Sequence, residues 1–360
     1  MDQSIVRALT GPRDQPVLTF ARTYRAGAAD LRDACTDIGR LARWFGTVTG
    51  DPARVGDAFE AALSEDPDDR ATGRVLRCTD DEVAVEWAWQ GEATSVISAR
   101  FREVDADRSE LTLRHELAEP GHAVGYGGGW EQVLQSLARA LGAVEEGAAG
   151  AVVASDEVQG ANLPGGEVAG EGVPSDDEIE AAAVEVWRTI TRAPLELGRA
   201  VDADPSRVWT ALATADGLRS WWWNHWDDVT VEADVRVGGA YRIEAPGAGL
   251  VLDGRYLDVE PPAAGRPGRL AMTWRWADAD GTSADEAVEI RVEHGSGEAA
   301  GSAEAAVVAG GPADGSDARG GGPGGSFVVV RHSGPWADDA PASSYRQGWE
   351  FTLGALAAAV

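Results

Sequence analysis

Hydrophobic and polar positions alternate with a period of two over several short segments of the chain, which predicts β-strands with one buried face. Turn residues such as Asp105 and Asp107 separate these segments, so we expect the strands to form antiparallel meanders. The segments with the clearest alternation are, in chain order, 83–89, 96–104, 111–117, 270–276, 288–292 and 327–332.

A helical period follows each series of strands. Large apolar residues recur three or four positions apart over 130–141 and 349–356, which predicts a long amphipathic helix at the end of each half. In the second half, Asp204 and Pro205 predict an earlier helix start, because Asp caps free N–H groups and Pro needs no donor in the first turn. Each half is therefore expected to be a curved sheet closed by a helix.

The two halves repeat one another, which indicates a duplicated domain. Pairs of short motifs occur in the same order in both halves, at a nearly constant offset until a Gly-rich stretch intervenes in the second half. The pairs are Thr36-x-x-Gly39 before Trp44-Phe45 with Thr214-x-x-Gly217 before Trp222-Trp223, Val55–Phe59 with Val237–Tyr241, Gly73–Leu76 with Gly254–Leu257, Trp87–Trp89 with Trp274–Trp276, Arg114-His115 with Arg331-His332, and Gly129-Trp130 with Gly348-Trp349.

Changes in composition mark the expected domain boundaries. The stretch that begins at residue 143 is rich in Gly, Ala and acidic residues, so 143–193 is expected to be a flexible acidic linker with a possible short helix. Residues 295–325 are richer still in Gly and Ala and predict a disordered loop. The expected domains are then 16–142 and 194–360.

The end of the linker carries two conflicting signals. Ser175-Asp-Asp-Glu178 has the spacing of a helix capping box, whereas Val184, Val186 and Ile190 alternate as they would in a strand. The sequence leaves helix and strand both open for this segment.

The repeated motifs resemble those of a known family. They are the Val-Gly-(Asp or Gly)-Ala-(Phe or Tyr) run, the double-Trp strand, the strand that ends in Arg-His and the closing Gly-Trp helix. Together they resemble the heat-shock protein 90 ATPase activator-like family of the START-like (SRPBCC, helix-grip) superfamily, over residues 16–142 and 194–360. The resemblance implies an α+β fold with two helix-grip domains, each a curved antiparallel sheet around a long C-terminal helix. It also implies a cavity that in many relatives receives a hydrophobic ligand.

Charge and composition exclude several functions. The chain has 60 acidic and 31 basic residues and a net charge of -29, which argues against nucleic-acid and anionic membrane partners. Every basic residue is Arg, so mechanisms that need a Lys are excluded. We find no nucleophile elbow and no phosphate-binding glycine motif, and we expect no cofactor.

Cys35 and Cys78 form no metal or disulfide motif, and the N-terminus has no signal peptide pattern. No apolar run is long enough to cross a membrane. These features predict a cytoplasmic protein.

The residues that are expected to face the interior are aromatic or His. Period two places Trp87 and Trp89 on one face of their strand, and this arrangement recurs in the second copy. These rings fit either a pocket wall that stacks on a flat ligand or a packed core. The candidate pocket residues are Trp44, Phe59, Trp87, Trp89, His115, Trp222, Tyr241, Trp274, Trp276 and His332.

His115 and His332 share the apolar face of their strands. As functional groups, they could orient a ligand carbonyl or act as acid and base. As structural groups, they could bond the backbone near the last helix. No second titratable group is seen to repeat at a fixed relation to them, which favours the structural role.

Trp221–Trp226 has no full counterpart in the first copy. It could be a ligand gate or partner surface, or a helix end that packs over the cavity mouth. His225 with Asp227 and Asp228 lacks a distant third ligand, so we predict no metal site.

We therefore expect a binding protein rather than an enzyme, with a small hydrophobic or aromatic ligand in an apolar cavity. The first alternative is a protein that binds a chaperone partner, as the family name suggests. The second is a cavity enzyme, of cyclase or hydrolase type, that uses a pocket His.

Overall fold

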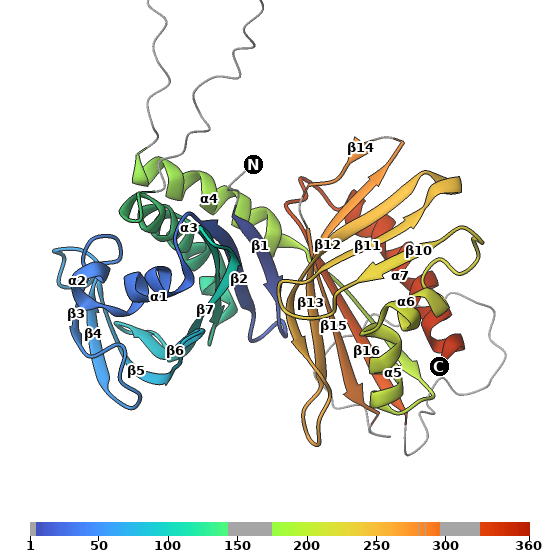
Figure 1. Ribbon diagram of the computed structural model, residues 1–360, viewed down its shortest axis with the longest axis horizontal. Coiled ribbons are helices and arrows are strands. Elements are labelled where there is room, and N and C mark those ends of the chain that lie inside the picture. The colour runs from blue at the N-terminus through green and yellow to red at the C-terminus, as the bar shows by residue number, and fades with distance from the viewer. Residues whose placement is uncertain (1–4, 143–174, 280, 285, 296–324) are drawn as a thin grey trace, which may run out of the picture.

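The chain folds into two eight-stranded antiparallel sheets, each packed against helices (Figure 1). This confirms the α+β fold with two helix-grip domains, called domain 1 and domain 2 below. The predicted linker, up to residue 174, and the Gly-rich loop over 296–324 lie outside the described residues. The computed structural model describes residues 5–142, 175–279, 281–284, 286–295 and 325–360.

The sheet of domain 1 has the strand order β1-β2-β8-β7-β6-β5-β4-β3. Its strands are β1 (Val6–Thr10), β2 (Val17–Tyr24), β3 (Thr47–Gly50), β4 (Ala58–Ala62), β5 (Arg70–Cys78), β6 (Glu82–Trp89), β7 (Ser95–Asp105) and β8 (Arg108–Glu116). Its helices are α1 (Ala28–Thr36), α2 (Ile38–Leu41), the short 3-10 helix η1 (Pro120–His122), α3 (Ala123–Ala140) and α4 (Asp176–Arg192).

Domain 2 repeats this arrangement with the order β10-β11-β12-β13-β15-β16-β9, and β14 pairs with β13. Its strands are β9 (Leu195–Val201), β10 (Thr230–Ala233), β11 (Ala240–Ala245), β12 (Leu250–Glu260), β13 (Gly268–Asp278), β14 (Gly281–Thr282), β15 (Glu286–His294) and β16 (Ser326–Ser333). Its helices are α5 (Pro205–Leu212), α6 (Ala215–Trp221), the 3-10 helix η2 (Pro246–Ala248) and α7 (Ala340–Ala359). The two orders coincide when β9 is matched with β2, so the predicted duplication is confirmed.

The helix caps correct one detail of the repeat. The Thr214 side chain caps α6 by accepting from the N–H of Gly217, and Asp37 caps α2 in the same way. Thr36, which we matched with Thr214, is instead the last residue of α1. The first motif pair is therefore out of register by one residue, because Asp and Thr both serve as caps and only the position of the helix identifies the capping residue.

Domain 1 is larger than the sequence indicated. Strand β1 pairs with β2 along the whole of its length, although we expected the domain to begin at residue 16. Helix α4 lies beside α3 in the same domain, although we assigned it to a flexible linker (Figure 1). The capping box of Ser175 and Glu178 is present in both directions, and the segment is a helix rather than a strand.

Trp187 holds α4 against domain 1. Its side chain is fully buried, its ring centroid lies 5.1 Å from that of Phe20, and its Nε1 donates to Glu131 Oε1 at 2.7 Å. The Gly-rich run in α3 makes this approach possible, because a Cβ at Gly127 would lie 2.3 Å from the indole ring. A Cβ at Gly128 would lie 2.4 Å from the side chain of Val184.

The two domains meet through the outer faces of their sheets, with β1 between them (Figure 1). A small apolar cluster at this interface joins Ala8 and Ala21 of domain 1 to Leu257, Ala271 and Ala287 of domain 2. The small side chains allow the sheets to approach closely.

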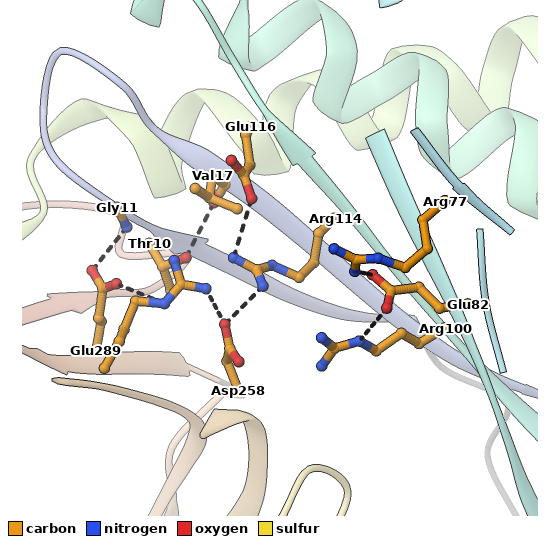
Figure 2. Close-up of polar contacts among 11 residues, drawn as sticks. Thr10, Gly11, Val17, Arg77, Glu82, Arg100, Arg114, Glu116, Asp258 and Glu289 are labelled. Atoms are coloured by element: carbon orange, nitrogen blue, oxygen red, sulfur yellow. Dashed lines mark hydrogen bonds and ion pairs between the residues drawn. The ribbon is translucent and has the colours of Figure 1, made fainter. Parts of the chain in front are cut away.

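Charged residues of the two domains also meet here, and Figure 2 shows the contacts of Arg114, Asp258 and Glu289. Arg114 Nη1 lies 2.7 Å from Asp258 Oδ2, and Arg269 also bonds Asp258. Glu289 Oε2 accepts from the backbone N–H of Gly11 at 2.8 Å. The contacts between the domains, Arg114 with Asp258 and Gly11 with Glu289, connect residues more than a hundred positions apart, so no pattern in the sequence indicated them.

Candidate functional site

Three indole rings lie in contact between the sheet and the closing helix of domain 2. Trp222 follows α6, Trp274 lies on β13 and Trp349 on α7, and all three are no more than 4% exposed. Their ring centroids are 5.2 to 5.9 Å apart. These distances are typical of aromatic contacts, so the rings form a packed cluster.

Domain 1 has the same cluster with one change. Phe45 takes the place of Trp222 and lies 5.9 Å from Trp87 and 6.2 Å from Trp130. The offset of one residue found at the helix caps persists here. Trp44 Nε1 donates to Ala34 O at 3.0 Å, just as Trp221 Nε1 donates to Ala211 O at 2.9 Å. Trp44 therefore corresponds to Trp221 and not, as we predicted, to Trp222.

His332 lies against this cluster and is fully buried. Its Nδ1 accepts from Trp349 Nε1 at 3.2 Å, and an indole N–H can only donate, so Nδ1 carries no proton. The proton of the neutral ring is then on Nε2 and is donated to Glu286 Oε2 at 3.0 Å. Trp336 Nε1 donates to the other oxygen of this carboxylate at 2.7 Å.

His115 has the same tautomer in domain 1. Trp130 Nε1 donates to its Nδ1 at 3.1 Å, and its Nε2 lies 2.8 Å from Ser95 Oγ. Ser95 in turn donates to the carbonyl of Trp87 at 3.0 Å. Both imidazoles therefore bond a Trp of the closing helix, whereas we expected a backbone group.

Burial keeps both imidazoles neutral. Desolvation lowers the pKa of His115 to about 3. Desolvation also lowers the pKa of His332, although its hydrogen bond to Glu286 opposes the shift. Both ring nitrogens of each His are engaged in hydrogen bonds to other side chains.

The partner of the His differs between the copies. Trp87 pairs with Ser95 across the strands of domain 1, and Trp274 pairs with Glu286 at the equivalent position of domain 2. Domain 2 therefore buries a carboxylate, 4% exposed, where domain 1 has a hydroxyl. The strand pairing was needed to find this difference, because neither residue belongs to a repeated motif.

A second titratable group does repeat beside each His, contrary to our expectation. Tyr126 and Tyr345 precede the Trp of the closing helix by one turn, and their rings lie 4.3 and 4.2 Å from His115 and His332. Burial raises the pKa of both phenols. The spacing Tyr-x-x-x-Trp, present in both halves, was the signal in the sequence for this contact.

The other predicted residues belong to the same interiors. Phe59 lies over Gly73, and Tyr241 lies over Gly254, where a Cβ would come within 2.4 and 2.8 Å of the rings. Trp44, Trp89 and Trp276 are half-buried, and the remaining predicted residues are buried. Residues of the same interiors that we did not predict are Phe45, Ser95, Tyr126, Trp130, Trp223, Glu286, Trp336, Tyr345 and Trp349.

Two buried indole donors in domain 2, Trp222 Nε1 and Trp274 Nε1, have no acceptor among the described residues. Trp222 Nε1 is inaccessible and makes no hydrogen bond. The equivalent Phe45 of domain 1 has no polar atom. An unpaired buried donor costs about 1 to 3 kcal/mol, so an acceptor brought by a ligand would be favoured at this point.

The Trp side chains of the segment 221–226, at the end of α6 and after it, are mostly buried. Trp221, Trp222 and Trp223 are buried, whereas His225 is exposed. Trp223 has φ 51°, in the left-handed region that disfavours a bulky residue.

The parts of the chain that the structure describes contain no group of three or more His, Cys, Asp or Glu that could hold a metal ion. None of the described helices is long and apolar enough to span a membrane.

The two antiparallel sheets and their helices agree with the match to a known family. The model of the family described as Activator of Hsp90 ATPase homolog 1-like protein matches residues 25–142 and 202–321. The chain belongs to this family. No curated protein matches it. Strand β1 and helix α4 lie outside both segments that match the Activator of Hsp90 ATPase homolog 1-like model, as do β2, β9, β16 and α7.

Several solved structures are similar to parts or all of the chain. The crystal structure of CalU16 from Micromonospora echinospora is 24% identical, covers 53% of this chain and 100% of its own, and has a TM-score of 0.39. DynU16, described as a protein in the dynemicin biosynthetic locus, is 14% identical over 97% of this chain and 98% of its own, with a TM-score of 0.32. PFC0360w, an HSP90 activator from Plasmodium falciparum, is 20% identical over 35% of this chain and 96% of its own, with a TM-score of 0.31.

Proposed function

We propose that domain 2 binds a small, planar, apolar molecule that carries a hydrogen-bond acceptor, between its sheet and α7. The observation that supports this most strongly is the buried N–H of Trp222. A carbonyl or similar oxygen on the ligand would satisfy this donor, while the rings of Trp274 and Trp349 would stack on the flat ligand.

Domain 2 is the better candidate of the two domains. Domain 1 has Phe45 in place of Trp222, so its cluster has one unpaired indole N–H, that of Trp87, where the cluster of domain 2 has two. The interior of domain 1 is also covered by α4, whose Trp187 is part of its core. Domain 2 has no such added helix among its described residues.

The His geometry does not support the alternative of a cavity enzyme. His332 donates to Glu286 on β15 and accepts from Trp349 on α7, so its two nitrogens connect the closing helix to the sheet. A chaperone partner stays a prediction, because Phe351 is the one large hydrophobic residue of α7 that is exposed, at 56%, and a single ring does not define a docking surface.

A matched pair of probes tests the proposal. 9-Fluorenone and fluorene have the same flat tricyclic frame, and only fluorenone carries a carbonyl. Fluorenone is expected to quench Trp fluorescence saturably and to raise the melting temperature through linkage. Because one neutral hydrogen bond contributes about 0.5 to 1.5 kcal/mol, fluorenone should bind roughly 2- to 10-fold more tightly than fluorene.

The substitution Trp222→Phe, which installs the residue of domain 1, should remove this preference and leave fluorene binding nearly unchanged. Trp89→Phe in domain 1 is the control, and it should keep the preference. Saturable binding of neither probe, or equal preference in wild type and Trp222→Phe, would contradict the proposal.

A further inference from the structure

The turns that follow α2 and α6 have the same backbone hydrogen bond, followed by a residue with a positive φ. The N–H of Phe45 bonds the carbonyl of Leu41 at 2.8 Å, and the N–H of Trp222 bonds that of Leu218 at 2.9 Å. The next residue has a positive φ in each case. In domain 1 this residue is Gly46, with φ 141°, and in domain 2 it is Trp223, with φ 51°.

A glycine at this position is easily explained, and a tryptophan is not. Gly has no Cβ and adopts positive φ freely, whereas the Cβ and ring of Trp clash with the neighbouring backbone there. Trp223 is the one non-glycine residue with positive φ among the described residues. Strained residues of this kind persist where the surrounding structure holds them, and they cluster at ligand clamps and switch regions.

The ring of Trp223 packs against two other aromatic rings of domain 2. Its centroid lies 5.5 Å from that of Trp276 at an interplanar angle of 89°, and 5.8 Å from that of Trp226 at 68°. Trp276 and Trp226 are half-buried, and Trp223 is 8% exposed. In domain 1, Trp89 occupies the place of Trp276, and Gly46 provides no ring to cover it.

The segment that carries Trp223 has room on one side. A surface hollow separates it from α7 and is lined by Ser220, Asn224, Phe351, Gly354 and Ala355, among others. Few backbone hydrogen bonds hold the turn itself, the main one being from the N–H of Trp226 to the carbonyl of Trp223 at 3.0 Å.

We propose that Trp223 is the gate of the ligand site in domain 2. In the closed state its ring covers the aromatic cluster at the expense of a strained backbone. Rotation of the turn toward the hollow beside α7 relieves that strain and exposes Trp222 and Trp274 to an entering ligand. This inference rests on the proposed function, because it assigns to one residue the control of access to the same site.

Stopped-flow Trp fluorescence with 9-fluorenone on the full chain tests the gate. Trp223→Gly, which installs the residue of domain 1, should raise the association rate constant about tenfold or more. Trp223→Phe is the matched control, because it keeps an aromatic ring over the cluster, and its rate should stay within about twofold of the wild type. Trp223→Asn provides a second open variant, since Asn tolerates the left-handed region.

The outcomes separate the gate from the ligand site. Equal association rates in the wild type and both open variants would overturn the gate and leave the proposed function standing. Binding in the open variants with none in the wild type would support the gate in its strongest form. Binding in none of the proteins would overturn both proposals.

Discussion

Arg114 on β8 of domain 1 and Asp258 on β12 of domain 2 form an ion pair, with 2.7 Å between Nη1 and Oδ2, at the centre of the domain interface. A bulge in β12 between Tyr256 and Asp258 makes the contact possible, because it turns both Leu257 and Asp258 toward domain 1. Burial opposes the charge of Asp258, yet Arg114 and Arg269 hold the pKa of this carboxyl below its usual value. The two domains are thus joined by charges that water does not screen.

Replacing Asp258 by Asn should weaken the docking of the domains. The change leaves Arg114 and Arg269 buried without their carboxylate, and breaking a buried pair costs about 3 to 5 kcal/mol. We expect a lower melting temperature and a larger radius of gyration in small-angle X-ray scattering. Asp253→Asn is the control, because the Arg242 and Arg275 partners of Asp253 are about half exposed, and its effect should stay below about 1 kcal/mol.

The same pair predicts the direction of the pH dependence of docking. Since the folded pKa of Asp258 lies below its unfolded value, the carboxylate contributes its full stability above the unfolded pKa. This contribution is lost as the pH falls through the folded pKa. Scattering curves of the wild type that show the same compact shape at neutral and strongly acidic pH would contradict this assignment.

Trp187→Ala should release α4 from domain 1. Removing a fully buried Trp costs about 3 to 5 kcal/mol, and here it also breaks the bond to Glu131. Hydrogen exchange should become faster over 176–192 and over the part of α3 that α4 covers. Glu185→Ala, on the exposed side of the same helix, is the control and should leave the exchange of both helices unchanged. Unaltered protection of α4 in Trp187→Ala would mean that other contacts hold it.

His115 should make the stability of domain 1 depend on pH in the acid range. Burial holds its pKa at about 3, so the unfolded chain binds a proton below about pH 6.5 that the folded chain does not bind. The free energy of unfolding should therefore fall as the pH decreases from about 6.5 to about 3, by at most about 1.4 kcal/mol per pH unit from this group.

Urea unfolding at several pH values measures this dependence. His115→Asn lacks the titrating ring, and its stability should be lower at pH 7 but should change less with pH over the same interval. An equal slope in the wild type and in His115→Asn would show that the imidazole is not the group responsible.

The fold could be predicted because its signals are local and occur twice. The alternation over 83–89 and 270–276 identifies strands without knowledge of the tertiary structure. Asp204 likewise caps a helix by accepting from the N–H groups of residues two and three positions later. The position of α4 could not be predicted in this way. Its apolar residues fit a helix or a strand, and the Gly residues of α3 that it packs against lie about sixty positions away.

The candidate site was predictable only in part. The alternation of side chains along the strands placed Trp87, Trp274 and the two His residues on the inner face of the sheets. The partner of each His depends on which residue faces it across the strands, and Ser95 and Glu286 gave no repeated pattern. The shift of one residue between Trp44 and Trp221 likewise needed the hydrogen bonds to Ala34 and Ala211, since adjacent aromatic residues align equally well in either register.

The amino-acid sequence by itself determined the family, the duplication and the inward direction of the indole rings, because these follow from periodicity and from motifs that recur along the chain. Only the tertiary structure decided the tautomer of each His, the unpaired N–H of Trp222 and the strained backbone of Trp223. These features depend on distances between atoms on separate strands and helices, or on a backbone angle imposed by the surrounding fold. The charged interface between the domains belongs to the same class, because close packing of two finished sheets is required before Arg114 and Asp258 can meet.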